Sequence, residues 1–248
     1  MNFTAPITCW NVNNKTYTAY SIIDDDYAIL PGEAFFVQCP DEINKISFPI
    51  DGRQLTSVIE SQSGAPAFEP VANQRALVDV ELTNGEQSDK TRFVLNPNAK
   101  MDYETSCDAS KFFSMESGVA QIYTIQNGIQ MAINERPADN GVVKIGIMIP
   151  ENGTYTIKSE RNALPEAVIV DNLNGTQAAL TAEGYTFNAE AGTTDNRFEL
   201  RLAGTTGIMN LNQSQSVGEG AYYNMNGQRV DAPQKGIYVV NGKKVIVK

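Results

Sequence analysis

Asn-Gly dipeptides recur along the whole chain, and they constrain its fold more than any other feature of the sequence. Both residues tolerate a positive φ, so an Asn-Gly pair between apolar runs is a strong signal for a tight β-hairpin turn. Strand-like segments flank several of these pairs, as in QIYTIQNGIQMAI and VVKIGIMIPENGTYTIK. The pattern predicts many strands joined by short turns. The residues followed by Gly are Asn84, Asn127, Asn140, Asn152, Asn174, Asn226 and Asn241.

Alternating apolar and polar residues mark individual strands with one buried face. The segment RALVDVEL at residues 75–82 alternates in this way, and RFELRL at residues 197–202 repeats the pattern. The side chains predicted to face inward are Ala76, Val78, Val80, Leu82, Phe198, Leu200 and Leu202. Those predicted to face solvent are Arg75, Asp79, Glu81, Arg197, Glu199 and Arg201.

Helical periodicity is weak throughout the sequence. No stretch carries a long apolar stripe at helical spacing, and the best helical candidate is a turn or two at residues 108–115, DASKFFSM. One-sided strands joined by short turns favour a sandwich over a parallel α/β fold. We therefore predict an all-β fold, with antiparallel β-sandwich domains followed by a small C-terminal β-hairpin module.

Two breaks in composition divide the chain. Residues 57–74 mix Ser, Gly, Pro and polar residues without periodicity, which is typical of a long loop. Residues 203–220 are rich in Gly, Ser, Thr, Asn and Gln, which is typical of a linker. The predicted organisation is an N-terminal β-rich domain at residues 1–72, a β-sandwich domain at 73–203, a linker at 204–219 and a C-terminal β tail at 220–248.

The composition excludes several kinds of chemistry. None of the 248 residues is histidine, which excludes Ser-His-Asp, Cys-His and His-rich zinc sites. A formal net charge of -10 disfavours nucleic acid and anionic lipid as partners, because phosphates are repelled. Cys9, Cys39 and Cys107 lie far apart without CxxC spacing, so we predict neither a thiolate metal site nor any cofactor. Two interpretations stay open for them: three plain buried thiols, or a bridge from Cys9 to Cys39.

A few residues invite a functional interpretation. The acidic run Asp24–Asp26 lacks the alternating spacing of a calcium loop, so a solvated loop is favoured over a metal site. Asp171 and Asp195, each followed by Asn, are interpreted as turn formers. Trp10 is the single tryptophan, and we expect it in the core or covering a sheet edge rather than as an exposed binding platform.

The C-terminal segment GAYYNMNGQRVDAPQKGIYVVNGKKVIVK carries a specific pattern. It resembles the type IX secretion sorting-domain-like tails of secreted and surface proteins of Bacteroidetes. Its lysines give it a charge opposite to that of the rest of the chain, which fits recognition by export machinery, docking, or protection of a sheet edge. The resemblance implies that the residues that carry it are used in sorting or anchoring. They are Tyr223, Asn224, Gly227, Gln228, Val230, Lys235, Gly236, Tyr238, Gly242, Lys243 and Lys244.

The preceding part of the chain is similar to the β-sandwich module that often comes before such tails. The resemblance implies an extracellular or cell-surface location and brings no catalytic residues with it. The start MNFTAPITCW predicts no signal peptide, and no apolar run reaches the ~18 residues of a membrane helix. We therefore expect the sequence to be a piece of a longer precursor. The similar segments are GEAFFVQ (32–38), SDKTRFVLN (88–96), DASKFFS (108–114), NGTYTI (152–157) and NRFELRL (196–202).

These observations give one functional hypothesis and two alternatives. The main hypothesis is a non-enzymatic, extracytoplasmic accessory module that carries or displays an upstream region of its parent protein and meets the surface export machinery. The first alternative is an adhesin or carbohydrate-binding module whose partner is a glycan or another surface protein, and an exposed aromatic patch would favour it. The second is a glycoside hydrolase with two carboxylates, which needs a cleft holding two acids, one with a raised pKa.

Overall fold

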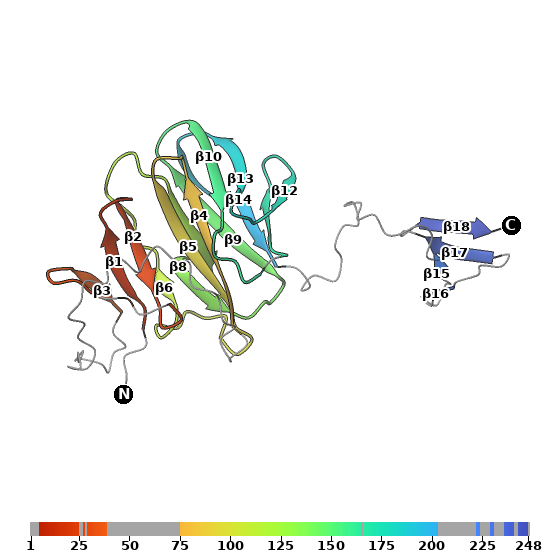
Figure 1. Ribbon diagram of the computed structural model, residues 1–248, viewed down its shortest axis with the longest axis horizontal. Helices are drawn as coiled ribbons and strands as arrows, with labels where there is room; N and C mark the ends of the chain where they lie inside the picture. Colours follow the sequence, from red (N-terminus) through yellow and green to blue (C-terminus); the bar gives the residue numbers. More distant parts are fainter. Residues whose placement is uncertain are drawn as a thin grey trace. The chain divides into compact units, whose positions relative to one another are not determined.

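The computed structural model describes residues 5–24, 27, 29–38, 75–164 and 166–202, and the backbone of four strands between residues 222 and 247. The chain forms two compact units, Met1–Thr205 and Thr206–Lys248 (Figure 1). In the described residues the regular structure is strand throughout, so the prediction of an all-β fold is confirmed. Among these residues no helix is long and apolar enough to cross a membrane.

A single 11-stranded sheet makes up most of the first unit. Its order is β12-β11-β14-β9-β7-β8-β5-β4-β10-β13, with β6 paired to β8. Neighbouring strands in it are antiparallel except β5 and β8, which are parallel. The strands are β4 (Ala76–Thr83), β5 (Ser88–Leu95), β6 (Ala109–Ser110), β7 (Gln121–Gln126), β8 (Ile129–Arg136), β9 (Val142–Ile149), β10 (Gly153–Lys158), β11 (Val168–Asp171), β12 (Thr176–Ala179), β13 (Tyr185–Ala189) and β14 (Gly192–Arg201).

The sheet curves back on itself around one core. Side chains from strands at both ends of the sheet, such as Ile169 of β11 and Phe187 of β13, belong to the same buried cluster as Ile145 at its centre. The two packed faces are therefore parts of one continuous, nearly closed sheet, rather than two separate sheets. Burial of such a cluster, at about 25 cal/mol for each Å² of apolar surface, is the main stabilising contribution to a fold of this kind.

The Asn-Gly pairs lie at turns, as predicted. Within the described residues they connect β4 to β5, β7 to β8, β8 to β9, β9 to β10 and β11 to β12. Between β7 and β8 both Asn127 and Gly128 have positive φ, 50° and 80°, which is the backbone of a two-residue type I′ turn. Asn226 and Asn241 lie outside the described residues.

The predicted inward faces are confirmed at most positions. Val78, Val80 and Leu82 are fully buried in β4, and Ala76 is partly buried. Phe198 and Leu200 of β14, and Leu202 directly after it, are all buried.

Several predictions at this level are wrong. Asp195, which was interpreted as a turn former, lies within β14. Arg197 does not face solvent, because the register of β14 against β9 shifts between Thr194 and Phe198 and turns its guanidinium into the protein, where it is 9% exposed. Residues 108–115 contain no helix. They form β6 and an extended segment, because the Lys111 N–H donates to the Gln130 carbonyl and joins this segment to β8.

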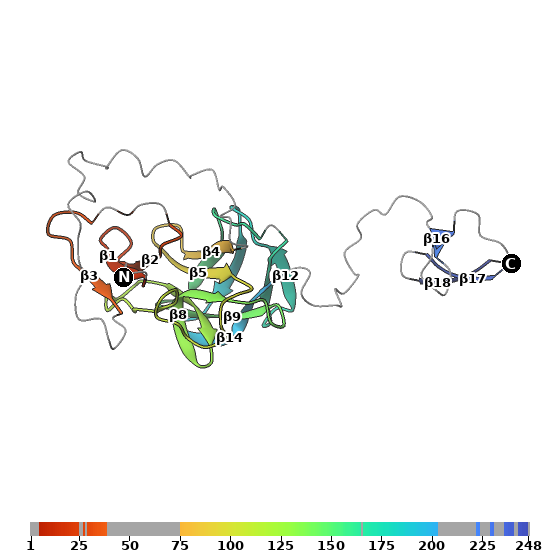
Figure 2. The ribbon, with the colours of Figure 1, turned by 90° about the horizontal axis from the view of Figure 1, so that it is seen from below.

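A second, three-stranded sheet covers part of the outer face of the first. Its order is β2-β1-β3, with β1 at Ile7–Asn11, β2 at Thr16–Tyr20 and β3 at Phe35–Val37. Both views show β1 and β2 beside β5 and β8, on the side away from β12 (Figures 1 and 2). We call residues 5–38 of this sheet and its connections the N-terminal layer, and residues 75–202 the body.

The second unit holds a small antiparallel sheet of its own, with the order β16-β15-β17-β18. It is larger than the predicted hairpin, because β15 and β16 extend the hairpin of β17 and β18 to four strands. The predicted domain boundaries stay predictions, and residues 39–74 and 203–221 lie outside the described residues. The strands are β15 (Tyr222–Tyr223), β16 (Arg229–Val230), β17 (Gly236–Val240) and β18 (Lys243–Val247).

Candidate functional site

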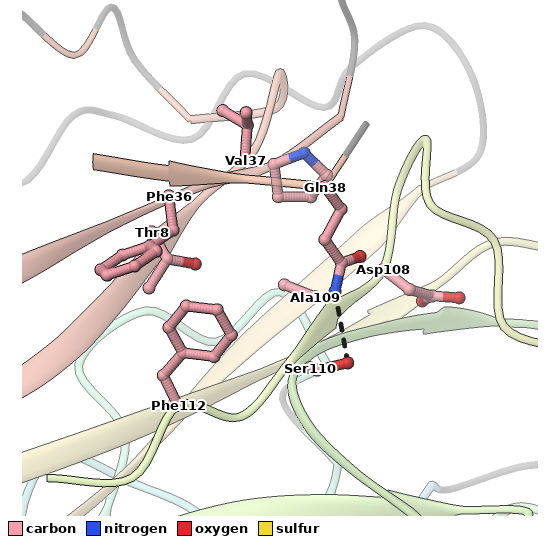
Figure 3. A pocket seen from close by; sticks show the side chains of 9 residues that line it. Thr8, Phe36, Val37, Gln38, Asp108, Ala109, Ser110 and Phe112 are labelled. Carbon is pink, nitrogen blue, oxygen red and sulfur yellow. Dashed lines mark hydrogen bonds between the residues drawn. The ribbon is translucent and has the colours of Figure 1, made fainter. Parts of the chain in front are cut away.

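A shallow cleft opens where the N-terminal layer meets the body, and Figure 3 shows it. One wall comes from β3 and the start of β1, and the other from β6 and the residues that follow it. The cleft is therefore assembled from segments more than 70 residues apart in sequence. Its lining residues are Pro6, Thr8, Phe36, Val37, Gln38, Asp108, Ala109, Ser110 and Phe112.

Aromatic rings make up one side of the cleft. Phe36 and Phe112 face each other edge to face, with ring centroids 5.0 Å apart. Tyr17 packs against both, at 6.0 Å from Phe36 and 5.8 Å from Phe112, and Trp10 packs against Tyr17 at 4.9 Å. Phe36 nevertheless stays 50% exposed. The cluster thus presents an aromatic ring to solvent at the cleft, although isolated exposed apolar side chains are common on protein surfaces.

Neutral polar groups make up the other side. The Gln38 amide Nε2 donates to Ser110 Oγ at 3.3 Å, across the two walls (Figure 3). The Tyr103 hydroxyl donates to Gln38 Oε1 and lies 3.3 Å from the Asp108 carbonyl oxygen. These bonds fix the amide and the hydroxyls at the edge of the aromatic cluster.

Asp108 lines the cleft, but its carboxylate points away from Phe36 and Phe112 (Figure 3). Its two oxygens accept the backbone N–H groups of Glu104 and Glu135, each at 2.8 Å. Burial, helped by the charges of Glu135 and Glu104, raises the pKa of this carboxyl to about 6, although the hydrogen bonds from the two backbone N–H groups lower it. The carboxylate therefore joins the turn at Glu104 to strand β8 and does not project into the cleft.

The other buried carboxylates are paired with basic side chains. Asp89 receives Lys111 Nζ at 2.5 Å, and both side chains are almost fully buried. Both carboxylate oxygens of Asp171 accept hydrogen bonds from the Arg197 guanidinium. Asp171 also accepts the backbone N–H groups of Leu173 and Asn174, so it is a turn former, as predicted. The hydrogen bonds and charge of Arg197 outweigh the effect of burial and lower the pKa of Asp171.

Asp24 is not the solvated loop residue that the sequence suggested. Its side chain is only 10% exposed and accepts hydrogen bonds from Arg92 and Arg161. Asp25 and Asp26 lie outside the described residues. Within the residues that the structure describes, no group of three or more His, Cys, Asp or Glu side chains could hold a metal ion.

Two further predictions concern Trp10 and the cysteines. Trp10 is partly buried and belongs to the aromatic cluster beside the cleft. Cys9 is a free, buried thiol, and burial raises its pKa to about 11. Cys107 is also free but only partly buried, and burial followed by the charge of Asp108 raises its pKa to about 12. Cys39 itself lies outside the described residues.

The residues predicted for sorting or anchoring all belong to the second unit. The sheet brings part of the motif together, since Tyr223 pairs with both Arg229 and Val239, and Lys244 also pairs with Val239. The described strands contain Tyr223, Val230, Gly236, Tyr238, Lys243 and Lys244, whereas Asn224, Gly227, Gln228, Lys235 and Gly242 lie outside the described residues.

Sequence reasoning missed Phe36 and Phe112 as partners. Each belongs to a Phe-Phe pair, in GEAFFVQ and in DASKFFS, and these pairs were the available signal. Nothing in the sequence shows that β3 lies beside the segment after β6, because that contact depends on how the N-terminal layer docks on the body.

Comparison with known proteins gives one match. A family model described as a domain of unknown function (DUF8693) matches residues 2–202, which is most of the chain. No curated protein and no solved structure matches the chain.

Proposed function

The chain belongs to the DUF8693 family, and we propose that it is a non-enzymatic accessory module of the cell surface. In this proposal the body and the N-terminal layer carry an upstream region of a longer parent protein. Residues 220–248 are the sorting signal that the export machinery recognises. The observation that carries the proposal is a coincidence of boundaries: the family match ends at residue 202, and the second compact unit begins at Thr206.

Two further features support an address in the second unit. It has its own four-stranded sheet, so its motif residues are held without help from strands of the first unit. Its lysines oppose the net charge of -10 of the whole chain, which suits separate recognition by an acidic partner. The resemblance to type IX sorting tails gives the proposed route and the proposed extracellular location.

Removal of the tail tests this proposal. Both proteins are expressed behind a secretion signal. We expect the full chain to reach the cell surface, where added protease can reach it, and the chain without Gly220–Lys248 not to be displayed there. Circular dichroism of the shortened protein is the control for folding. A second arm fuses residues 204–248 to a secreted reporter, which should then gain surface retention. Unchanged surface delivery of the shortened chain would contradict the proposal.

A second candidate function is ligand binding at the cleft, and Phe36 is the observation that favours it. A half-exposed aromatic ring beside the Gln38 amide and the Ser110 hydroxyl suits a neutral sugar ring, which has an apolar C–H face and hydroxyl groups. This would make the module an adhesin or a carbohydrate-binding protein. Asp108 gives no support to a carboxylate hydrolase, because both of its oxygens are held by backbone amides.

A glycan array separates the two candidates. The wild-type protein is compared with Phe36→Ala and with Met115→Ala, which removes another exposed apolar side chain outside the cleft. We expect a glycan signal that Phe36→Ala abolishes and Met115→Ala preserves. If no glycan binds, or if both variants lose the glycan signal equally, only the accessory role remains as a proposed function.

A further inference from the structure

The N-terminal layer rests on the body through a small apolar contact. Ala19 and Ile23 are the residues of the layer that pack against the buried cluster on the outer face of the main sheet. That cluster consists of Leu77, Val94, Ala109, Ala132 and Ile133. This cluster is much smaller than the main core cluster, so burial of apolar surface here stabilises the layer less than it stabilises the main core.

Charged side chains provide a further part of the attachment, in addition to the aromatic contacts of Phe112 with Tyr17 and Phe36. The hydrogen bond from Gln38 to Ser110 also joins the two parts. Arg92 of β5 binds Asp79 of the neighbouring strand through two contacts, Nε to Oδ1 at 2.6 Å and Nη2 to Oδ2 at 2.9 Å. Its remaining nitrogen, Nη1, binds both oxygens of Asp24 at 2.5 Å, and Arg161 Nη1 binds Asp24 Oδ1 at 3.1 Å. The negative charges of two aspartates are thus balanced by two arginines, with Asp24 as the member from the layer and the other three from the body.

Asp24 has a special place in this group. Of the ion pairs between described residues, only those of Asp24 join the N-terminal layer to the body. The side chains of Arg92 and Asp24 are 7% and 10% exposed, so the pair is shielded from solvent and from salt. Removing one member of such a pair leaves the other charge buried and unpaired, which is strongly destabilising.

The same junction determines the shape of the cleft. Phe36 and Gln38 lie on the layer, whereas Ser110 and Phe112 lie on the body, so the distance between the walls depends on how the layer docks. We infer that Asp24 is a positioning residue for the cleft, and that the N-terminal layer is a lid that opens as a unit when the ion pairs of Asp24 with Arg92 and Arg161 break.

Hydrogen–deuterium exchange of the full-length chain tests the inference with Asp24→Asn. This variant removes the charge but keeps an oxygen that can accept the Ser21 N–H, which Asp24 Oδ2 accepts at 2.7 Å. We expect the amide protons of β1 and β2 to exchange at least about tenfold faster than in the wild type, while those of β9 and β14 keep their rates. Arg161→Gln removes the outer partner alone and should accelerate the same strands less.

The control variant is Glu199→Gln, which breaks an ion pair with Arg201 on the far side of the body and should leave β1 and β2 unchanged. Trp10 gives a second readout, because the single tryptophan lies on β1 and its quenching by acrylamide should rise in Asp24→Asn. Unchanged exchange in β1 and β2 would overturn the inference. Equal acceleration in β9 and β14 would overturn it too, since the whole fold would then be opening rather than the layer.

Discussion

Arg197 illustrates how one buried charge is accommodated in this core. Its guanidinium carbon lies 4.7 Å from the ring centroid of Phe187 and 4.9 Å from that of Phe198, and its nitrogens bind Asp171. The rings and the carboxylate together replace the water that the guanidinium loses. The alternating pattern of RFELRL placed this residue in solvent, because a pattern cannot show the shift in register after Thr194.

We predict that Asp171→Asn destabilises the protein by about 3 kcal/mol, because it leaves Arg197 buried without a counter-charge. The variant keeps an oxygen for the turn N–H groups, so the loss reports the ion pair. Urea unfolding at pH 7 measures the free energy of unfolding. The control is Glu199→Gln, whose pair with Arg201 is partly exposed and should cost less than about 1 kcal/mol.

Asp108 gives the stability a dependence on pH. Its pKa of about 6 in the folded protein lies above the ordinary value of 3.8, so between these values the folded state holds more protons than the unfolded state. Stability from this group therefore falls as the pH rises toward 6. We predict a loss of about 1 kcal/mol between pH 5 and pH 7 that Asp108→Asn removes. Urea unfolding at both pH values measures it, and parallel profiles for wild type and variant would contradict it.

Gly146 lies where two side chains approach the backbone of β9. A Cβ atom there would lie 2.1 Å from Tyr123 Cε2 and 2.6 Å from Asp195 Oδ1. We predict that Gly146→Ala costs about 1–3 kcal/mol through displacement of the buried Tyr123 ring. Gly153→Ala is the matched control, since its nearest neighbour would be 3.6 Å away. Thermal unfolding of both variants measures the difference, and equal costs would show that the close approach does not matter.

At the scale of elements, the segment after β6 is held by a buried ion pair. Lys111 Nζ binds Asp89 of β5 at 2.5 Å, and the same carboxylate oxygen accepts the N–H of Ile122 in β7. One carboxylate therefore joins three segments of the body. The sequence DASKFFSM suggested a helical turn here, and the long-range bonds of Lys111 to Asp89 and Gln130 overrode that local preference.

We predict that Lys111→Met destabilises the body by about 3–5 kcal/mol, because Asp89 is left buried without its cation. The double variant Lys111→Met, Asp89→Asn should recover a large part of this loss, since no unpaired charge remains. Chemical unfolding followed by circular dichroism measures both. A single variant as stable as the wild type would show that the pair contributes little.

Sequence alone predicted the elements better than their docking. The Asn-Gly turns and the inward faces of β4 and β14 follow from local chemistry, and the structure confirms them at residues such as Val80 and Leu200. The cleft depends on contacts such as that between Phe36 and Phe112, which no local pattern encodes. Asp79 was predicted to face solvent, but its side chain is only 14% exposed and binds Arg92 of the neighbouring strand, a contact that no alternating pattern shows.

For the whole molecule, the division at Thr205 has a direct consequence for stability. Because Met1–Thr205 is one compact unit, its cooperative unfolding should not require the second unit. We predict that truncation after Thr205 changes the free energy of unfolding in urea by less than ~0.5 kcal/mol, as expected of changes remote from a core. A shifted midpoint would show that the tail stabilises the body.

The pairing of β4 with β10 has a consequence during synthesis. β4 meets β5 at once in a local hairpin, but its other edge pairs with Lys158 and its neighbours, which leave the ribosome some 75 residues later. Until then an apolar strand edge is open to wrong partners. Production of soluble protein should therefore improve at low temperature, where the apolar association of exposed strand edges is weaker.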